Sequence, residues 1–126
     1  MNTALILFAH GARDPEWARP LRRVEAAIRQ RVTSVAVELA FLEFLTPTLT
    51  DSVAKMAAEG VEKIAVLPMF IAAGGHLKRE LPEMIERLRA IYPDIEFVQY
   101  GAIGEHERVI QAIATASLEV AGLPLA

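Results

Sequence analysis

Two histidines are the residues of this chain best suited to bind a metal ion. His10 follows the apolar run Ala4–Ala9, and His76 follows the glycine pair Gly74 and Gly75. Imidazole is a good ligand for borderline divalent ions such as cobalt, nickel, iron and zinc. Because these histidines are distant in the chain, only the fold could bring them to one ion. Each could instead cap a helix or hydrogen-bond a loop, and the pattern alone leaves both interpretations open.

Two glutamates are candidates for proton transfer beside these histidines. Glu43 follows a second strand-like run, and Glu80 lies four residues after His76. If a helix begins at Leu77, Glu80 could face His76 and act as an acid, a base or a partner that orients the ring. A glutamate in a first helical turn is also favourable to the helix dipole alone. We retain both glutamates as candidate catalytic residues.

Three further residues near the histidines are candidates for holding a substrate. Arg13 could pair with a substrate carboxylate, or with its neighbours Asp14 and Glu16. Gly74 and Gly75 would let a bulky ligand approach the backbone, although a tight turn after a strand also favours glycine. We therefore predict that Arg13, Gly74 and Gly75 contact the ligand.

Short apolar runs alternate with helical patterns, which predicts one α/β domain over residues 1–126. The predicted strands are Ala4–Ala9, Val35–Leu42, Lys63–Ile71 and Ile95–Tyr100. The predicted helices are Glu16–Arg31, a segment from an N-cap at Thr46 through Pro47 to Gly60, Leu77–Ile91 and about Glu105–Ala121. Repeated βαβ units predict a four-stranded parallel sheet with helices on both faces, a flavodoxin-like lobe. Ligands bind beyond the carboxyl ends of such strands, where we expect His10, Glu43 and His76.

The composition argues against several classes of protein. The chain has no cysteine, which excludes disulfides and thiolate metal sites, and its net charge of −3 disfavours a nucleic-acid partner. No apolar run approaches the roughly 20 residues of a membrane helix, and Met1–Leu7 lacks a basic leader, so we expect a cytoplasmic protein without a membrane partner. No G-x-x-x-x-G-K-[ST] or G-x-G-x-x-G motif is present. We therefore expect no ATP, NAD or other organic cofactor.

Three linked motifs resemble those of the small CbiX-type sirohydrochlorin chelatases, the class II, ATP-independent family. The first resembles "GHGSRDP", the second "AFLE…P-S-L" and the third "P-x-F-L…G-x-H-x-x-x-D-I-P". They fall on His10–Pro15, on Ala40–Glu43 with Pro47–Leu49, and on Pro68–Phe70 with Gly74–His76 and Glu80–Pro82. Ala9 and Ala12 replace the usual Gly and Ser, and Glu80 and Leu81 replace the usual Asp and Ile.

This resemblance implies a chelatase-like fold and insertion of a divalent metal into sirohydrochlorin, in cobalamin or sirohaem-type biosynthesis. The metal is a substrate: Co²⁺, or alternatively Ni²⁺ or Fe²⁺. The family's two metal-binding histidines correspond to His10 and His76, and its acidic position corresponds to Glu43. Because larger chelatases of this class have two similar lobes, the resemblance also implies a homodimer with the macrocycle between the subunits.

Two other functions are compatible with these residues. A non-enzymatic carrier on the same fold would bind metal and tetrapyrrole without turnover. A histidine phosphatase or mutase would also place His-Gly after a strand, but that class expects an arginine before the histidine, where this chain has Ala9. Incubation with a phosphodonor would trap phosphohistidine in that case.

Overall fold

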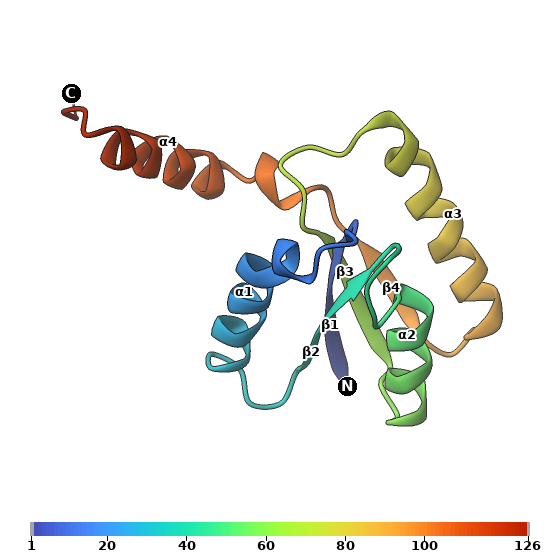
Figure 1. The fold of residues 1–126 in the computed structure, drawn as a ribbon. Helices are drawn as coiled ribbons and strands as arrows, with labels where there is room; N and C mark the ends of the chain where they lie inside the picture. Colours follow the sequence, from blue (N-terminus) through green and yellow to red (C-terminus); the bar gives the residue numbers. More distant parts are fainter. Residues whose placement is uncertain (1, 126) are drawn as a thin grey trace.

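The computed structural model describes residues 2–125 and shows a parallel four-stranded sheet with helices on both faces (Figure 1). The strands are β1 (Thr3–Ala9), β2 (Ala36–Phe41), β3 (Lys63–Pro68) and β4 (Glu96–Gln99), in the order β2-β1-β3-β4. The helices are α1 (Arg19–Arg29), α2 (Leu49–Ala58), α3 (Gly75–Ile91) and α4 (Glu107–Ala121), with short 3-10 helices η1 (Pro15–Ala18) and η2 (Ile103–Glu105). The predicted fold class is confirmed.

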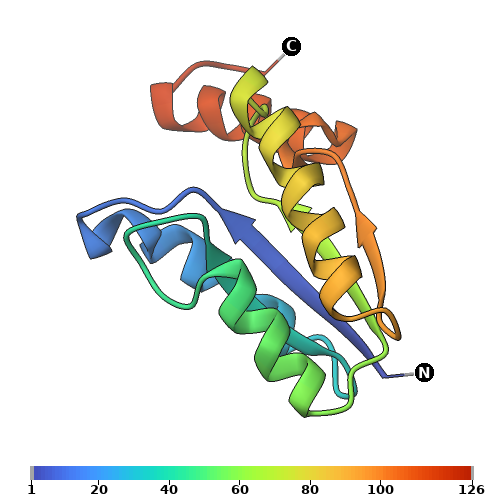
Figure 2. The same cartoon turned by 90° about the vertical axis from the view of Figure 1, so that its right-hand side faces the viewer.

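The apolar runs form the central strands because both of their faces can be buried. On one face, Ile6 and Phe8 of β1 lie beside Ile64 and Val66 of β3 and pack under α2 and α3. On the other face, Leu7 of β1 packs with the residues of β2 and the segment around α1. Figure 2 shows α2 and α3 running side by side along the first of these faces.

The first predicted helix, Glu16–Arg31, is wrong at its start and its end. The chain forms η1 over Pro15–Ala18, and the α-helix runs only from Arg19 to Arg29. Pro20 explains the start, since proline has no N–H to donate and is accommodated best in the first turn of an α-helix.

The N-cap of α2 is Thr48, so the prediction of Thr46 as the cap is wrong. Thr48 Oγ1 accepts a hydrogen bond from the Asp51 N–H at 3.2 Å, and an Asp51 carboxylate oxygen accepts one from the Thr48 N–H at 3.1 Å. The helix cannot begin at Pro47, because the Pro47 carbonyl accepts from the Phe41 N–H at 2.9 Å and is held against the end of β2.

The other predicted boundaries shift by a few residues. Strand β3 ends at Pro68, short of the predicted Ile71, because proline has no N–H for the ladder. Helix α3 begins at Gly75 instead of Leu77, and β4 is shorter than the predicted Ile95–Tyr100. No helix among residues 2–125 is long and apolar enough to cross a membrane.

Candidate functional site

His10 and Glu43 meet at the carboxyl ends of β1 and β2. His10 Nε2 lies 3.3 Å from Glu43 Oε1, and each side chain is about half exposed. The backbone fixes this pairing, because Leu42 N–H donates to the Ala9 carbonyl at 2.9 Å and Glu43 N–H donates to the His10 carbonyl at 3.0 Å. An ionised carboxylate only accepts hydrogen bonds, so Nε2 is the donor in this contact. In a neutral ring, Nδ1 then carries the lone pair that can bind a metal.

Gly11 is required for the loops that carry this pair to approach each other. Its φ is +95°, and a Cβ built there would lie 1.8 Å from the Glu43 carbonyl oxygen. Both the positive φ and the lack of space exclude any side chain at position 11 without a backbone shift. The glycine that follows His10 therefore has a structural role in placing Glu43.

His76 and Glu80 form a second pair on the first turns of α3. Their spacing of four residues places them on one side of the helix, with His76 Nε2 2.7 Å from Glu80 Oε2. The side chain of His76 is 81% exposed, and that of Glu80 is 34% exposed. Oxygen Oε2 of Glu80 is itself shielded from solvent and makes no aligned hydrogen bond. The contact is thus a close pair of an imidazole and a carboxylate, and it becomes an ion pair only when the imidazole is protonated.

The structure brings the predicted residues to one end of the sheet but not into a single cluster. His10 follows β1, Glu43 follows β2 and His76 follows β3, and β1 lies between β2 and β3. Among residues 2–125, no three His, Asp or Glu side chains are grouped closely enough to hold a metal ion. The arrangement is therefore two separate His–Glu pairs at the same rim.

Arg13 lies over an aromatic ring at this rim. Its guanidinium carbon is 5.2 Å from the centre of the Phe44 ring, which is cation–π geometry. Phe44 has a φ of 70° and stays 55% exposed, so this large apolar side chain faces solvent beside Glu43. Sequence reasoning missed Phe44 as a functional candidate, although its position directly after Glu43 was a usable signal.

The glycines near His76 have different surroundings. A Cβ at Gly74 or Gly75 would meet no atom within 4 Å, so both positions are open to a ligand. By contrast, a Cβ at Gly104 would lie 2.3 Å from Ile71 Cα, and the Gly104 N–H donates to the Phe70 carbonyl at 2.9 Å. Gly104 thus locks η2 against the loop that leads to His76, a role that nothing in its sequence context indicated.

The space beside His76 is shallow. A hollow of about 380 Å³ is lined by His76, Arg79, Glu80, Glu83 and Arg87, and it carries charges of both signs. Ligand pockets that enclose a drug-sized molecule measure roughly 300–1,000 Å³. A tetrapyrrole is larger than such a molecule, so this hollow by itself cannot enclose one.

A model of the CbiX family matches residues 4–120 of the chain. The chain belongs to the CbiX family. It is 29% identical over 112 residues to a sirohydrochlorin cobaltochelatase of Priestia megaterium, in an alignment that covers 89% of this chain and 36% of the relative. The chain thus spans about a third of that curated relative.

Two solved structures show the same fold in proteins of different length. A CbiX protein of Marinobacter aquaeolei VT8 has a TM-score of 0.86 and 30% identity, covering 95% of this chain and 98% of that one. The sirohydrochlorin chelatase SirB of Bacillus subtilis subspecies spizizenii, in complex with cobalt, has a TM-score of 0.82 and 26% identity. That match covers 95% of this chain but 51% of SirB, so the chain corresponds to one half of SirB.

Proposed function

We propose that this protein is a sirohydrochlorin chelatase that inserts Co²⁺ into the tetrapyrrole, with His10 and His76 as the metal ligands. The observation that carries the proposal is the pair of His–Glu contacts at one rim of the sheet, with both imidazoles accessible to solvent. The relative named as a cobaltochelatase and the neighbour solved with cobalt support Co²⁺ as the metal. Ni²⁺ and Fe²⁺ are alternative substrates, because imidazole and carboxylate accept all three ions.

The two pairs provide the charge balance that a cation needs. His76 is almost fully exposed and is positioned to take a hydrated ion first. The shielded oxygen of Glu80 gains from a positive charge beside it, so a metal ion at His76 replaces the interaction that a protonated ring supplies. His10 then completes the metal contact from the neighbouring strand, once the tetrapyrrole has docked.

Insertion releases two pyrrole N–H protons as one divalent ion enters the macrocycle, so a base must stand near the metal. Glu43 is our first choice to accept a proton, because its carboxylate is half exposed and is held against His10 by the backbone. Glu80 is our second choice. Positioning of the two reactants and removal of water from the ion supply most of the acceleration, without a covalent intermediate.

Arg13, Gly74 and Gly75 are proposed to hold the tetrapyrrole. Sirohydrochlorin carries many carboxylates, and the guanidinium of Arg13 can pair with one of them while it stays over Phe44. The exposed ring of Phe44 offers the macrocycle an apolar surface. The open space around Gly74 and Gly75 lets the macrocycle approach the start of α3.

We further propose that the chain works as a homodimer with the macrocycle between two copies. Two observations support this: the hollow beside His76 is too shallow to enclose a tetrapyrrole, and the chain corresponds to one half of SirB. A cytoplasmic location stays a prediction from the sequence.

The test is an anaerobic spectroscopic insertion assay with sirohydrochlorin and each metal. We expect His10→Ala and His76→Ala each to lower the insertion rate with Co²⁺ by at least about 100-fold, since even partners of metal ligands contribute 10–100-fold. His106→Asn is the matched control: it removes the third histidine, at the start of α4, and keeps an N-cap acceptor for the Arg108 N–H. We expect it to insert metal at close to the wild-type rate.

Two results would overturn the assignment. Undiminished insertion by both alanine variants would remove His10 and His76 from the reaction. Tight binding of cobalt and sirohydrochlorin without any turnover by the wild-type protein would make it a carrier instead of an enzyme.

A further inference from the structure

The segment between β1 and β2 is positively charged in a chain that is acidic as a whole. Residues 13–31 carry six arginines and three acidic residues, whereas the whole chain has a net charge of −3. All three acidic side chains have a partner within the segment: Asp14 caps η1, Glu16 pairs with Arg19, and Glu25 pairs with Arg29. Among residues 2–125, no carboxylate pairs with the other arginines of this segment.

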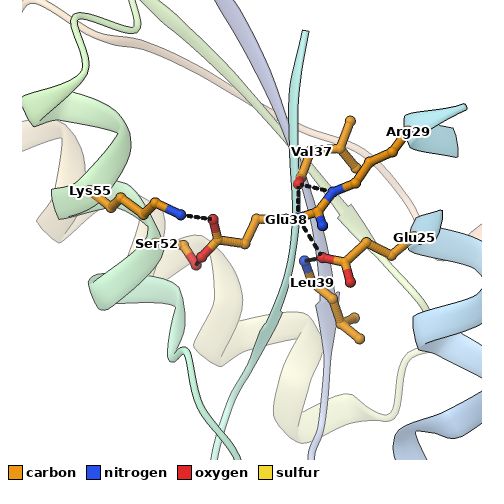
Figure 3. A network of polar contacts seen from close by, with 7 residues as sticks. All are labelled: Glu25, Arg29, Val37, Glu38, Leu39, Ser52 and Lys55. Atoms are coloured by element: carbon orange, nitrogen blue, oxygen red, sulfur yellow. Dashed lines mark hydrogen bonds and ion pairs between the residues drawn. The ribbon is translucent and has the colours of Figure 1, made fainter.

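One side of α1 closes the outer edge of β2. Glu25 and Arg29 lie one turn apart on the helix and meet alternate residues of the strand. The Glu25 carboxylate accepts from the Leu39 N–H at 2.7 Å, and the Arg29 guanidinium donates to the Val37 carbonyl (Figure 3). These side chains occupy backbone groups that an added strand would need. Both residues therefore have a structural role along this edge.

Arg22 is the next residue along this side of α1, but it has a different partner. It lies three positions before Glu25, and its guanidinium carbon is 5.6 Å from the centre of the ring of Phe41, the last residue of β2. At this position the chain itself supplies the partner of the strand edge, because the Pro47 carbonyl accepts from the Phe41 N–H. Among residues 2–125, Arg22 makes no hydrogen bond and no ion pair.

Stacking on an aromatic ring leaves a guanidinium able to bind an anion. The contact with the ring uses the face of the planar group, whereas the N–H donors point outward in its plane. A carboxylate can accept two of these N–H groups at once, in a contact stronger than one between neutral groups. Arg13 lies over Phe44 in the same way. Both arginines thus keep their N–H donors available for a carboxylate.

The two stacked arginines lie at the rim that carries the first His–Glu pair. In the register of β1 and β2, Phe41 is beside Ala9, the residue before His10. Phe44 directly follows Glu43. The rings that hold the two guanidinium groups are therefore three positions apart, at the end of β2 and on the loop that continues from it.

We propose that Arg22 binds a side-chain carboxylate of the tetrapyrrole bidentately and, together with Arg13, gives the site its preference for a carboxylate-rich macrocycle. This role rests on the proposed function and assigns a further binding residue to the same site. Sirohydrochlorin carries carboxylates around its periphery, so arginines from α1 and from the loop after β1 can take different ones. The aromatic rings hold both guanidinium groups in place beforehand, which lowers the entropic cost of binding.

Titration of metal-free sirohydrochlorin with the full chain measures this contact in the absence of any reaction. We expect Arg22→Gln to raise the Kd by about 10-fold, the contribution of a hydrogen bond to a charged group. Arg23→Gln is the matched control, since it removes the same charge from the next position of α1, where the side chain is exposed. We expect it to change the Kd by less than about twofold. An unchanged Kd for Arg22→Gln, or equal losses in both variants, would overturn the proposal.

Arg22→Lys distinguishes a bidentate contact from the effect of charge alone. Lysine keeps the positive charge and a long side chain that can cover the Phe41 ring, but it lacks the planar fork. We expect the Kd of Arg22→Lys to stay at least about threefold above that of the wild type. Full recovery of wild-type binding would overturn the bidentate contact. This readout remains available if Arg22→Gln fails to fold.

The insertion assay separates this role from the proposed function. For Arg22→Gln we expect a higher KM for sirohydrochlorin and a kcat close to that of the wild type, because Arg22 contacts the periphery of the macrocycle and not its nitrogen atoms. Metal insertion by the wild type, with an unchanged Kd in Arg22→Gln, would contradict the role of Arg22 alone. Binding that depends on Arg22 in a wild-type protein that inserts no metal would contradict the chelatase proposal alone. A wild-type protein that binds no sirohydrochlorin would overturn both.

Discussion

The two His–Glu pairs are built in different ways, although they lie at the same end of the sheet. His10 and Glu43 come from different strands and are held by backbone hydrogen bonds and by the absence of a side chain at Gly11. His76 and Glu80 lie one turn apart on α3, and their contact needs only the spacing of a helix. The first pair is therefore fixed by tertiary structure, and the second by local structure. A fixed pair suits proton transfer to a defined position, whereas an exposed pair on a helix end suits the capture of a hydrated ion.

The largest expected effect is the loss of stability when Gly11, which allows the His10 and Glu43 loops to approach each other, is replaced. Gly11→Ala should lower the free energy of unfolding by about 3 kcal/mol or more, because it combines an unfavourable φ with a collision against backbone atoms. Gly75→Ala is the matched control, since its Cβ meets nothing, and we expect a change within about 1 kcal/mol. Urea unfolding followed by circular dichroism measures both. Equal stability of the two variants would mean that the approach of the His10 and Glu43 loops is not tightly constrained.

Substitution of Glu43 and of Glu80 should affect different steps of the proposed reaction. We expect Glu43→Gln to lower the rate of metal insertion by about 100-fold, at the low end of the contribution of a positioned base, and to leave cobalt binding nearly unchanged. Glu80→Gln should act mainly on binding, raising the Kd for cobalt by about 10-fold, because Glu80 is the partner of the exposed histidine. Cobalt titration and single-turnover insertion give the two quantities separately. If Glu43→Gln instead weakened cobalt binding and Glu80→Gln instead lowered the insertion rate, the His10–Glu43 pair would capture the ion and the His76–Glu80 pair would accept the proton.

The smallest expected effect is on stability and concerns Thr48, which lies at the far end of the loop that carries Glu43. Thr48→Ala should lower the free energy of unfolding by about 1 kcal/mol, because it removes the side-chain oxygen that caps α2. Thr46→Ala removes the residue that the sequence pattern favoured, and we expect a change within about 0.5 kcal/mol. Thermal unfolding with a calorimeter can resolve the two. A larger loss in the Thr46 variant would place the cap where the sequence predicted it.

The architecture could be predicted from the sequence because it depends on local patterns. Runs such as Ala4–Ala9 have the length and the apolar side chains of buried strands, and helices between them impose parallel pairing. The wrong predictions concern the ends of helices and strands, at positions where a contact with a residue distant in the chain determines where the element begins or ends. Thr46 fails as a cap because the Pro47 carbonyl is bonded to Phe41, and the last residues of the predicted strand Lys63–Ile71 leave the sheet after Pro68.

The candidate site was predictable in part. That His76 and Glu80 would meet follows from their spacing, and the sequence predicted it as one of two interpretations. The partner of His10 was not predictable from spacing, because Glu43 reaches it through the pairing of β1 and β2. The assignment of His10 and His76 to one metal ion stays a prediction.

By itself, the sequence determined the order of strands and helices, the chemistry of the residues after each strand and the membership of the CbiX family, since hydrophobic spacing and side-chain type are properties of the chain. Only the tertiary structure decided that the site consists of two separate pairs, that Gly11 must lack a side chain and that α4 extends away from the sheet (Figure 1). Those features depend on which atoms meet across the fold, and residues distant in the chain meet only after the sheet has formed.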